Sequence, residues 1–142
     1  MKDYLKIQKL WYDDCLDEVK IVCSSPIITA SAKVYVCDSI IDALVQQIQL
    51  FLSGKITEGY WTNGERGNDS TTCASLRFLH KDRLGHILIE VYMELDDGGS
   101  YNTHNCCFYL NTETGLLEKF CKNLPKLKQK LRGVEVVLNN LE

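Results

Sequence analysis

The chain has 142 residues, of which 45% are hydrophobic and 25% are charged, and its formal net charge is −3. This is the composition of an ordinary soluble globular domain, and it excludes disordered, collagen-like and proline-rich chains. No run of roughly 18 apolar residues occurs, so no transmembrane helix is predicted. The first residues carry no apolar stretch typical of a signal peptide, so we expect a cytoplasmic protein with a single domain over residues 1–142.

Cysteines are frequent, but their pattern matches no metal or disulfide framework. They are odd in number and form no Cys-x-x-Cys pair. In a chain without a secretion signal, such cysteines are usually reduced and packed as small apolar side chains. We therefore expect no disulfide, no bound metal and no cofactor. The seven are Cys15, Cys23, Cys37, Cys73, Cys106, Cys107 and Cys121.

The charges are distributed unevenly along the chain. Residues 1–118 hold 17 acidic and 10 basic side chains, a net charge of −7, whereas residues 119–132 hold six basic side chains and no acid. The basic segment is interpreted as a solvated helix face, whose cations favour the C-terminal end of the helix dipole. The net charge gives no reason to expect binding to nucleic acid or to a membrane.

The first 36 residues are predicted to form three antiparallel strands. Apolar and polar residues alternate from Leu5 to Tyr12, from Glu18 to Cys23 and from Ile28 to Val36. Turn residues separate these runs at positions 13–14 and 24–26. Alternation with period two, interrupted by short turns, is typical of a meander with one buried face.

A helix is predicted next, over residues 38–52, because the apolar spacing changes to three and four residues. Asp38 and Ser39 are the predicted capping residues, and Gly54 is placed to end the helix in a left-handed conformation. Residues 53–72 are irregular, although Asn63-Gly64 is compatible with a short hairpin around Tyr60 and Trp61.

Three further strands and a second helix are predicted in the remainder of the chain. The strands cover residues 73–81, 86–96 and 101–110. The helix follows the start signal Thr112-Glu113, and at Pro125 it either kinks and continues to Gly133 or gives way to a new turn. Residues 134–137 form a last strand or a tail. The order βββ-α-βββ-α predicts an α+β fold, with one antiparallel sheet of about six strands and two helices on one face. The predicted core comprises Ile41, Leu44, Ile48, Leu76, Phe78, Ile89, Val91, Met93, Phe108, Leu117 and Phe120.

The outward face of the strand at residues 86–96 is the first candidate site. Glu90, Tyr92, Glu94 and Asp96 occur at every second position, and Tyr109 and Asn105 would lie beside them if the next strand pairs with this one. Carboxylates interleaved with tyrosines suit a surface that binds a basic protein. The alternative interpretation is an ordinary polar face in contact with solvent.

Two aromatic residues in the glycine-rich loop form a second candidate. Tyr60 and Trp61 are either anchors of an interface or side chains folded back onto the core.

A pair of residues on the last long strand offers a catalytic alternative. His104 and Cys106 are two positions apart, so their side chains lie on the same face of a strand. This arrangement could supply a cysteine–histidine pair or part of a zinc site, but a structural zinc needs four ligands with characteristic spacing, and the chain contains no GxSxG, HExxH, Walker or GxGxxG motif. The alternative is a core cysteine beside a histidine at the start of the strand.

The order of elements from residue 36 to residue 124 resembles a known family. The helix at 38–52 and a polar loop precede Leu76-Arg77-Phe78, the hairpin at 82–87 and the strand that ends near Glu94. Cys107-Phe108-Tyr109-Leu110 and the closing segment from Gly115 to Leu124 complete the pattern. It resembles WapI-type immunity proteins and related small bacterial domains. The resemblance implies a cytoplasmic protein that neutralises a cognate toxin, and it supplies no catalytic residue.

Two functional hypotheses follow from the sequence. The first is a binding protein, an immunity protein by the resemblance, that contacts a basic protein partner through Glu90, Tyr92, Glu94, Asp96, Tyr60 and Trp61. The second is a small-molecule-binding or enzymatic domain with a pocket between sheet and helix near His104 and Cys106. A deep pocket with converging polar groups would favour the second hypothesis. The partner's identity and the oligomeric state are left open.

Overall fold

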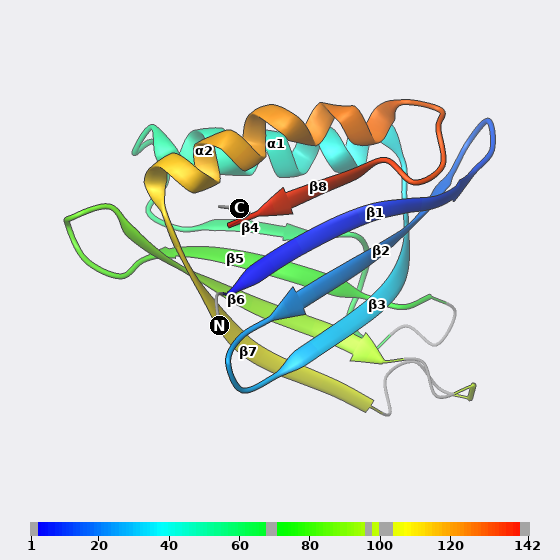
Figure 1. The fold of residues 1–142 in the computed structure, drawn as a ribbon, viewed down its shortest axis with the longest axis horizontal. Coiled ribbons are helices and arrows are strands. Elements are labelled where there is room, and N and C mark those ends of the chain that lie inside the picture. Colours follow the sequence, from blue (N-terminus) through cyan, green and yellow to red (C-terminus); the bar gives the residue numbers. More distant parts are fainter. Residues whose placement is uncertain (1–2, 68–70, 96–97, 100–103, 140–142) are drawn as a thin grey trace.

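The computed structural model describes residues 3–67, 71–95, 98–99 and 104–139, and it confirms the α+β class. Two antiparallel sheets of four strands face each other, and the helices lie along one side of them (Figure 1). The first sheet has the strand order β3 (Thr29–Val36), β2 (Asp17–Ser24), β1 (Tyr4–Tyr12) and β8 (Glu135–Leu138). The second has the order β4 (Gly59–Thr62), β5 (Ala74–His80), β6 (His86–Leu95) and β7 (His104–Glu113).

The expectation of one sheet with about six strands is therefore wrong. Strand β3 pairs only with β2 and packs against β6 of the opposite sheet, and β8 returns from the C-terminal end to pair with β1. The width of sheet that two helices can cover explains why the chain forms two sheets and not one. A sheet of six strands is about 29 Å wide, whereas two helices cover about 20 Å. Two smaller sheets stacked face to face bury both apolar faces completely.

One continuous core fills the space between the sheets and the helices. All eleven residues of the predicted core are buried in it, which confirms the faces predicted for the two helices and for β5, β6 and β7. On β1 the predicted alternation is wrong at its end, because a register shift between Lys9 and Trp11 leaves Trp11 exposed. Strands β8 and β4 complete the two sheets. The sequence predicts a strand or a tail at the position of β8 and part of a short hairpin at the position of β4. No helix in the described part of the chain is long and apolar enough to cross a membrane.

The helices cover the edges of the sheets that lie on one side of the molecule. Helix α1 (Asp38–Leu52) packs against β4, and α2 (Thr114–Asn123) and the 3₁₀ turn η1 (Leu124–Lys128) pack against β8 (Figure 1). Helix α1 begins after Cys37 without a side-chain cap, so the predicted cap by Asp38 and Ser39 is wrong. Gly54 has a φ of +78° just beyond the helix, as predicted.

The basic segment at residues 119–132 is partly neutralised by acids of the N-terminal half. Lys128 Nζ lies 2.8 Å from Asp42 Oδ1 on α1, and Lys130 Nζ lies 3.6 Å from Asp17 Oδ1 on β2. Pro125 opens the 3₁₀ turn in the middle of this segment. The cations therefore attach the C-terminal region to the acidic body as well as facing solvent.

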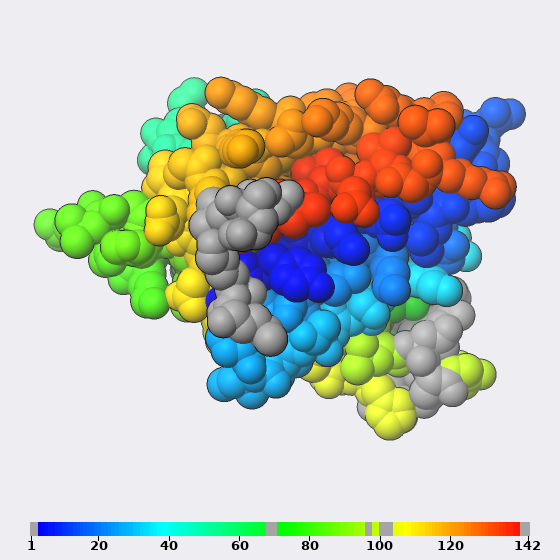
Figure 2. All heavy atoms as spheres, in the orientation of Figure 1, coloured from blue at the N-terminus to red at the C-terminus, as the bar shows by residue number. Residues whose placement is uncertain are grey.

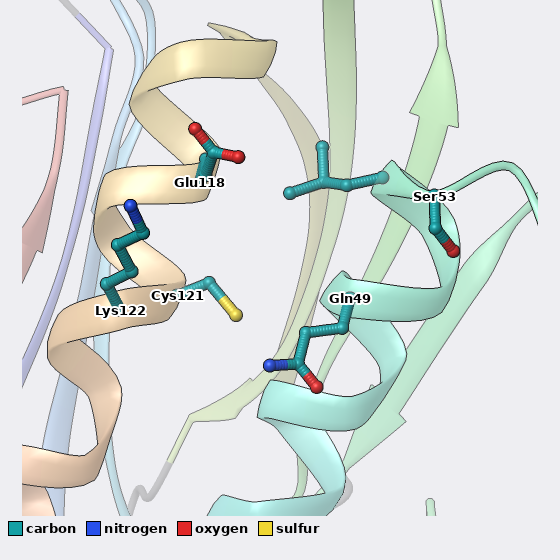
Figure 3. A pocket seen from close by; sticks show the side chains of 6 residues that line it. Gln49, Ser53, Glu118, Cys121 and Lys122 are labelled. Atoms are coloured by element: carbon teal, nitrogen blue, oxygen red, sulfur yellow. The ribbon is translucent and has the colours of Figure 1, made fainter.

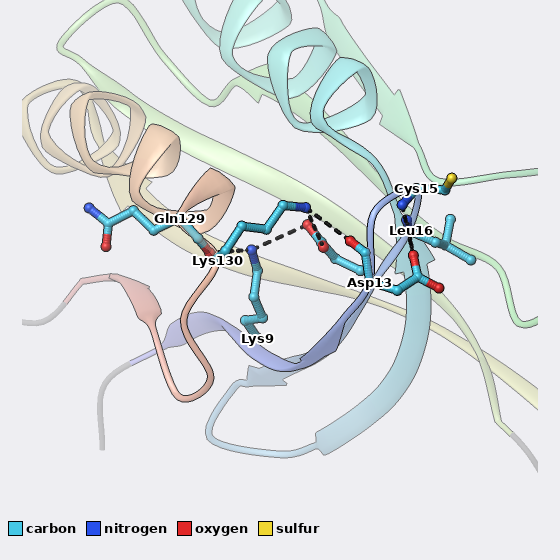
Figure 4. A network of polar contacts seen from close by, with 7 residues as sticks. Lys9, Asp13, Cys15, Leu16, Gln129 and Lys130 are labelled. Atoms are coloured by element: carbon cyan, nitrogen blue, oxygen red, sulfur yellow. Dashed lines mark hydrogen bonds and ion pairs between the residues drawn. The ribbon is translucent and has the colours of Figure 1, made fainter.

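A buried lysine connects the first sheet to the C-terminal region (Figure 4). Lys9 is fully buried on β1, where its Nζ donates to the carbonyl oxygen of Gln129 at 2.6 Å and lies 3.2 Å from Asp17 Oδ2. The backbone of Lys9 also pairs with Val134 and Gly133. Figure 2 shows the red C-terminal strand seated along the blue N-terminal strand, which is the arrangement these bonds fix.

We predict that removing one member of the buried pair of Lys9 and Asp17 destabilises the fold, and that removing both members does so much less. Lys9→Met leaves the carboxylate of Asp17 buried without its closest cation, so the free energy of unfolding should fall by about 3 kcal/mol. The double variant Lys9→Met/Asp17→Leu should recover most of that loss, because no unpaired charge remains. Urea unfolding measures both, with Lys33→Met at an exposed position as the control. A Lys9→Met protein as stable as the parent would contradict the prediction.

Candidate functional site

A straight row of four side chains crosses the outer face of the second sheet. Tyr60 on β4, Arg77 on β5, Glu90 on β6 and Tyr109 on β7 are successive partners in the strand register, and we call them the outer row. The guanidinium of Arg77 lies 4.6 Å from the centre of the Tyr60 ring, and its Nε lies 3.5 Å from Glu90 Oε1. The hydroxyl of Tyr109 donates to Glu90 Oε2 at 2.9 Å. Each member therefore holds the next one in place.

The outer row is exposed although its members contact one another. Tyr60 and Tyr109 retain 37% and 45% of their surface in contact with solvent. The hydrogen bond to Glu90 raises the pKa of Tyr109, so its hydroxyl stays protonated at neutral pH. Glu58 lies 3.5 Å from Arg77 on the side opposite Glu90. Arg77 therefore lies between two carboxylates, those of Glu58 and Glu90.

Two of the predicted site residues are buried under a loop, so the expectation that they face solvent is wrong. Glu94 is fully buried, and its carboxylate accepts hydrogen bonds from the backbone N–H groups of Gly67 and Cys73 and from the Tyr92 hydroxyl. Arg66 covers the Tyr92 ring at 3.8 Å. The loop backbone needs an acceptor when it folds over the sheet, and Glu94 supplies it.

The chemistry around Glu94 is that of a structural clamp. Burial, followed by the hydrogen bond to Glu94, raises the pKa of Tyr92 to about 12. The three donors on Glu94 come from two loop amides and one hydroxyl, all at 2.8–3.0 Å. This carboxylate positions the loop at Gly67 and Cys73, and it is not available to a partner.

The aromatic pair is divided between the core and the surface. Trp61 is 3% exposed, and its indole N–H donates to the carbonyl oxygen of Ile40 on α1 at 2.9 Å. It is therefore a core residue, and its predicted role as an exposed anchor is wrong. Tyr60 faces the other way and belongs to the outer row. The next strand does pair with β6, so Tyr109 and Asn105 lie beside this face as expected, with Tyr109 opposite Glu90 and Asn105 opposite Glu94. Asp96 lies outside the described residues.

The catalytic alternative finds no support in the geometry around His104 and Cys106. Burial raises the pKa of the Cys106 thiol, which is the opposite of the shift that activates a nucleophile. A hollow of about 330 Å³ lies instead between α1 and α2, lined by Gln49, Glu118, Cys121 and others (Figure 3). Burial raises the pKa of Cys121 as well. In the described part of the chain, no three potential metal ligands come together.

All seven cysteines are free thiols. Where the surroundings shift the pKa of a thiol, the direction of the shift differs from one cysteine to another. Burial raises the pKa of Cys23, Cys73 and Cys107. The pKa of Cys37 is lowered, because its Sγ interacts with the Ser39 hydroxyl at 3.1 Å and with backbone N–H groups at the start of α1.

Comparison with known proteins adds no family to this description. No protein-family model, no curated protein and no solved structure matches the chain.

The sequence missed Arg77 as a site residue. Its role depends on the pairing of β4 with β5, which places Tyr60 beside it. The only signal in the sequence was the expected hairpin around Tyr60, which could have been extended to the strand that contains Arg77.

We predict that Glu94→Gln loosens the loop at residues 63–73. A glutamine side chain has one acceptor oxygen, so it cannot accept hydrogen bonds from all three donors. The free energy of unfolding should therefore fall by about 1–3 kcal/mol. Arg66 lies in the loop, so the rate of tryptic cleavage after Arg66 should rise severalfold. Glu90→Gln makes the same chemical change two residues away and should leave that rate unchanged. Equal cleavage of the two variants would refute the clamp.

We predict that Cys37 is alkylated faster at pH 7 than Cys107, although Cys107 is the more exposed of the two. A lowered pKa gives Cys37 a larger thiolate fraction at neutral pH, whereas the raised pKa of Cys107 reduces it. The difference should shrink as the pH rises, because Cys107 then also ionises. Mass spectrometry after brief iodoacetamide treatment measures both rates, and Ser39→Ala should slow the reaction of Cys37. Faster labelling of Cys107 at pH 7 would contradict this assignment.

Proposed function

We propose that this chain is a protein-binding domain, and that it neutralises a toxin by holding it against the outer row of the second sheet. The observation that carries the proposal is the outer row itself: two exposed tyrosines and an arginine, arranged in line by their own contacts. Tyrosine and arginine are enriched among the residues that dominate binding energy in protein interfaces.

The internal contacts of the outer row favour a protein partner. Arg77 is held between Tyr60 and Glu90, and Tyr109 is held by Glu90, so little side-chain entropy is lost when a partner arrives. The row runs across four strands of a sheet face, which is a shape that suits another protein surface better than a small molecule.

The charge and the resemblance favour a basic toxin as the partner. Residues 1–118 carry a net charge of −7, and the carboxylates of Glu58 and Glu90 flank the single cation of the outer row. Acidic groups at such a site accelerate encounter with a basic protein. The pattern at residues 36–124 resembles WapI-type immunity proteins, whose role is to neutralise a toxin.

Site-specific crosslinking in the source cells tests the surface. A photoreactive phenylalanine analogue should capture the partner when it replaces Tyr60 or Tyr109. Tyr35 is the matched control, because it is 42% exposed on β3 of the other sheet. We expect a covalent adduct of defined mass from positions 60 and 109 and none from position 35. The same adduct from all three positions, or from position 35 alone, would overturn the proposed surface.

Variants then test whether binding neutralises a toxin. Tyr109→Ala and Arg77→Ala should each weaken binding of the captured protein about tenfold or more, whereas Tyr35→Ala should leave it unchanged. Expression of the captured protein alone should arrest growth, and co-expression of the parent chain should restore it. A captured protein without effect on growth would refute the toxin role while leaving the binding surface intact.

A further inference from the structure

The four outer strands of the two sheets differ in how their free edges are protected. Strand β4 lies against α1, where the Gln47 side chain accepts a hydrogen bond from the backbone of Tyr60, and β8 lies against α2 and η1. Strand β3 carries a charged residue, Lys33, which is a common defence of an exposed edge. Strand β7 pairs with β6 on one side, and no other described strand pairs with it on the other side.

The last part of β7 is capped by side chains from the first sheet. The backbone N–H of Asn111 donates to Asp3 Oδ2 at 2.7 Å, and its carbonyl oxygen accepts from Asn139 Nδ2 at 2.8 Å. Both backbone groups of Asn111 therefore point away from β6. In an antiparallel strand this direction recurs at every second residue, so Asn105, Cys107 and Tyr109 also present their backbone groups outward.

Within the described part of the chain, these outward groups form an open edge at residues 105–109. No other described segment pairs with the backbone of Asn105, Cys107 or Tyr109, and the side chains of all three are exposed. The register with β6 is continuous through this stretch, and the stretch contains no charged residue, proline, glycine or bulge. It lacks the features that usually prevent another strand from pairing with an edge.

We propose that the partner is recognised by strand addition, with an extended segment of the partner protein pairing along β7 at residues 105–109. This inference rests on the proposed function, and it names the structural class of the partner's contact. Main-chain hydrogen bonds to Asn105, Cys107 and Tyr109 would supply the register. Tyr109 belongs both to this edge and to the outer row, so the added strand would extend the proposed surface without a break.

A strand of the partner is favoured over a second copy of this chain by charge. Each copy carries a net charge of −3, so two copies repel each other, whereas a basic partner is attracted. The edge itself carries no charged side chain that could offset the repulsion. The partner segment is expected to be an uncharged strand, because β7 has no charged side chain at residues 105–110.

Hydrogen exchange of the free chain gives the first test. The amides of Asn105, Cys107 and Tyr109 should exchange at least tenfold faster than those of Phe108 and Leu110, which point to β6. Protection of the outward amides that grows with protein concentration would assign the edge to a second copy. Protection that is independent of concentration would mean that the chain covers its own edge. Either result overturns the proposal.

A proline variant gives the second test, with the protein captured by the crosslinker at Tyr109 as the probe. Cys107→Pro removes one outward N–H and leaves the ladder between β6 and β7 intact, so it should weaken binding at least tenfold. Cys107→Ala keeps that N–H and should bind within twofold of the parent. If circular dichroism shows that Cys107→Pro is unfolded, Asn105→Pro near the end of the strand replaces it.

The outcomes separate this inference from the proposed function. Slow exchange of the Cys107 and Tyr109 amides in the complex, together with weak binding of the proline variant, supports strand addition. Capture at Tyr60 and Tyr109 with unchanged binding of the proline variant keeps the proposed surface and overturns strand addition. Absence of any adduct at those two positions overturns both.

Discussion

The arrangement of the first sheet depends on one buried ion pair. Lys9 is enclosed between β1, β2 and the segment before β8, where Asp17 and the carbonyl oxygen of Gln129 contact its ammonium group. These two partners come from opposite ends of the chain. The C-terminal segment is therefore fixed at β1 by the need to satisfy a buried cation as well as by apolar packing.

The outer row is a consequence of the buried row beside it. Trp61, Leu76, Val91 and Phe108 are register partners on the inner face, one position away from the outer row on every strand. Because side chains alternate between faces, burial of these four forces their neighbours outward. The hydrogen bond from Trp61 to Ile40 ties this register to α1. The register that buries the inner row therefore also determines which four residues form the outer row.

Local periodicity predicted the parts of the structure that depend on neighbouring residues, and it missed those that depend on distant ones. The alternation at residues 86–95 placed Ile89 and Val91 in the core and Glu90 beside Tyr109. Nothing within that strand could reveal that a loop some 25 residues earlier covers Glu94, because alternation reports a face and not what lies over it. The division into two sheets was missed for the same reason, since it depends on β3 packing against β6 across the core and on β8 returning to pair with β1.

The pairing of the first strand with the last has a consequence for biosynthesis. While the chain is being made, β1 remains the outer strand of a three-stranded sheet, and Lys9 lacks Gln129, until the residues of β8 have emerged. Contacts between such distant segments form late and slowly. The edge of β1 stays unpaired throughout that interval, and an unpaired strand edge leaves a chain prone to aggregation until residues 135–138 have emerged.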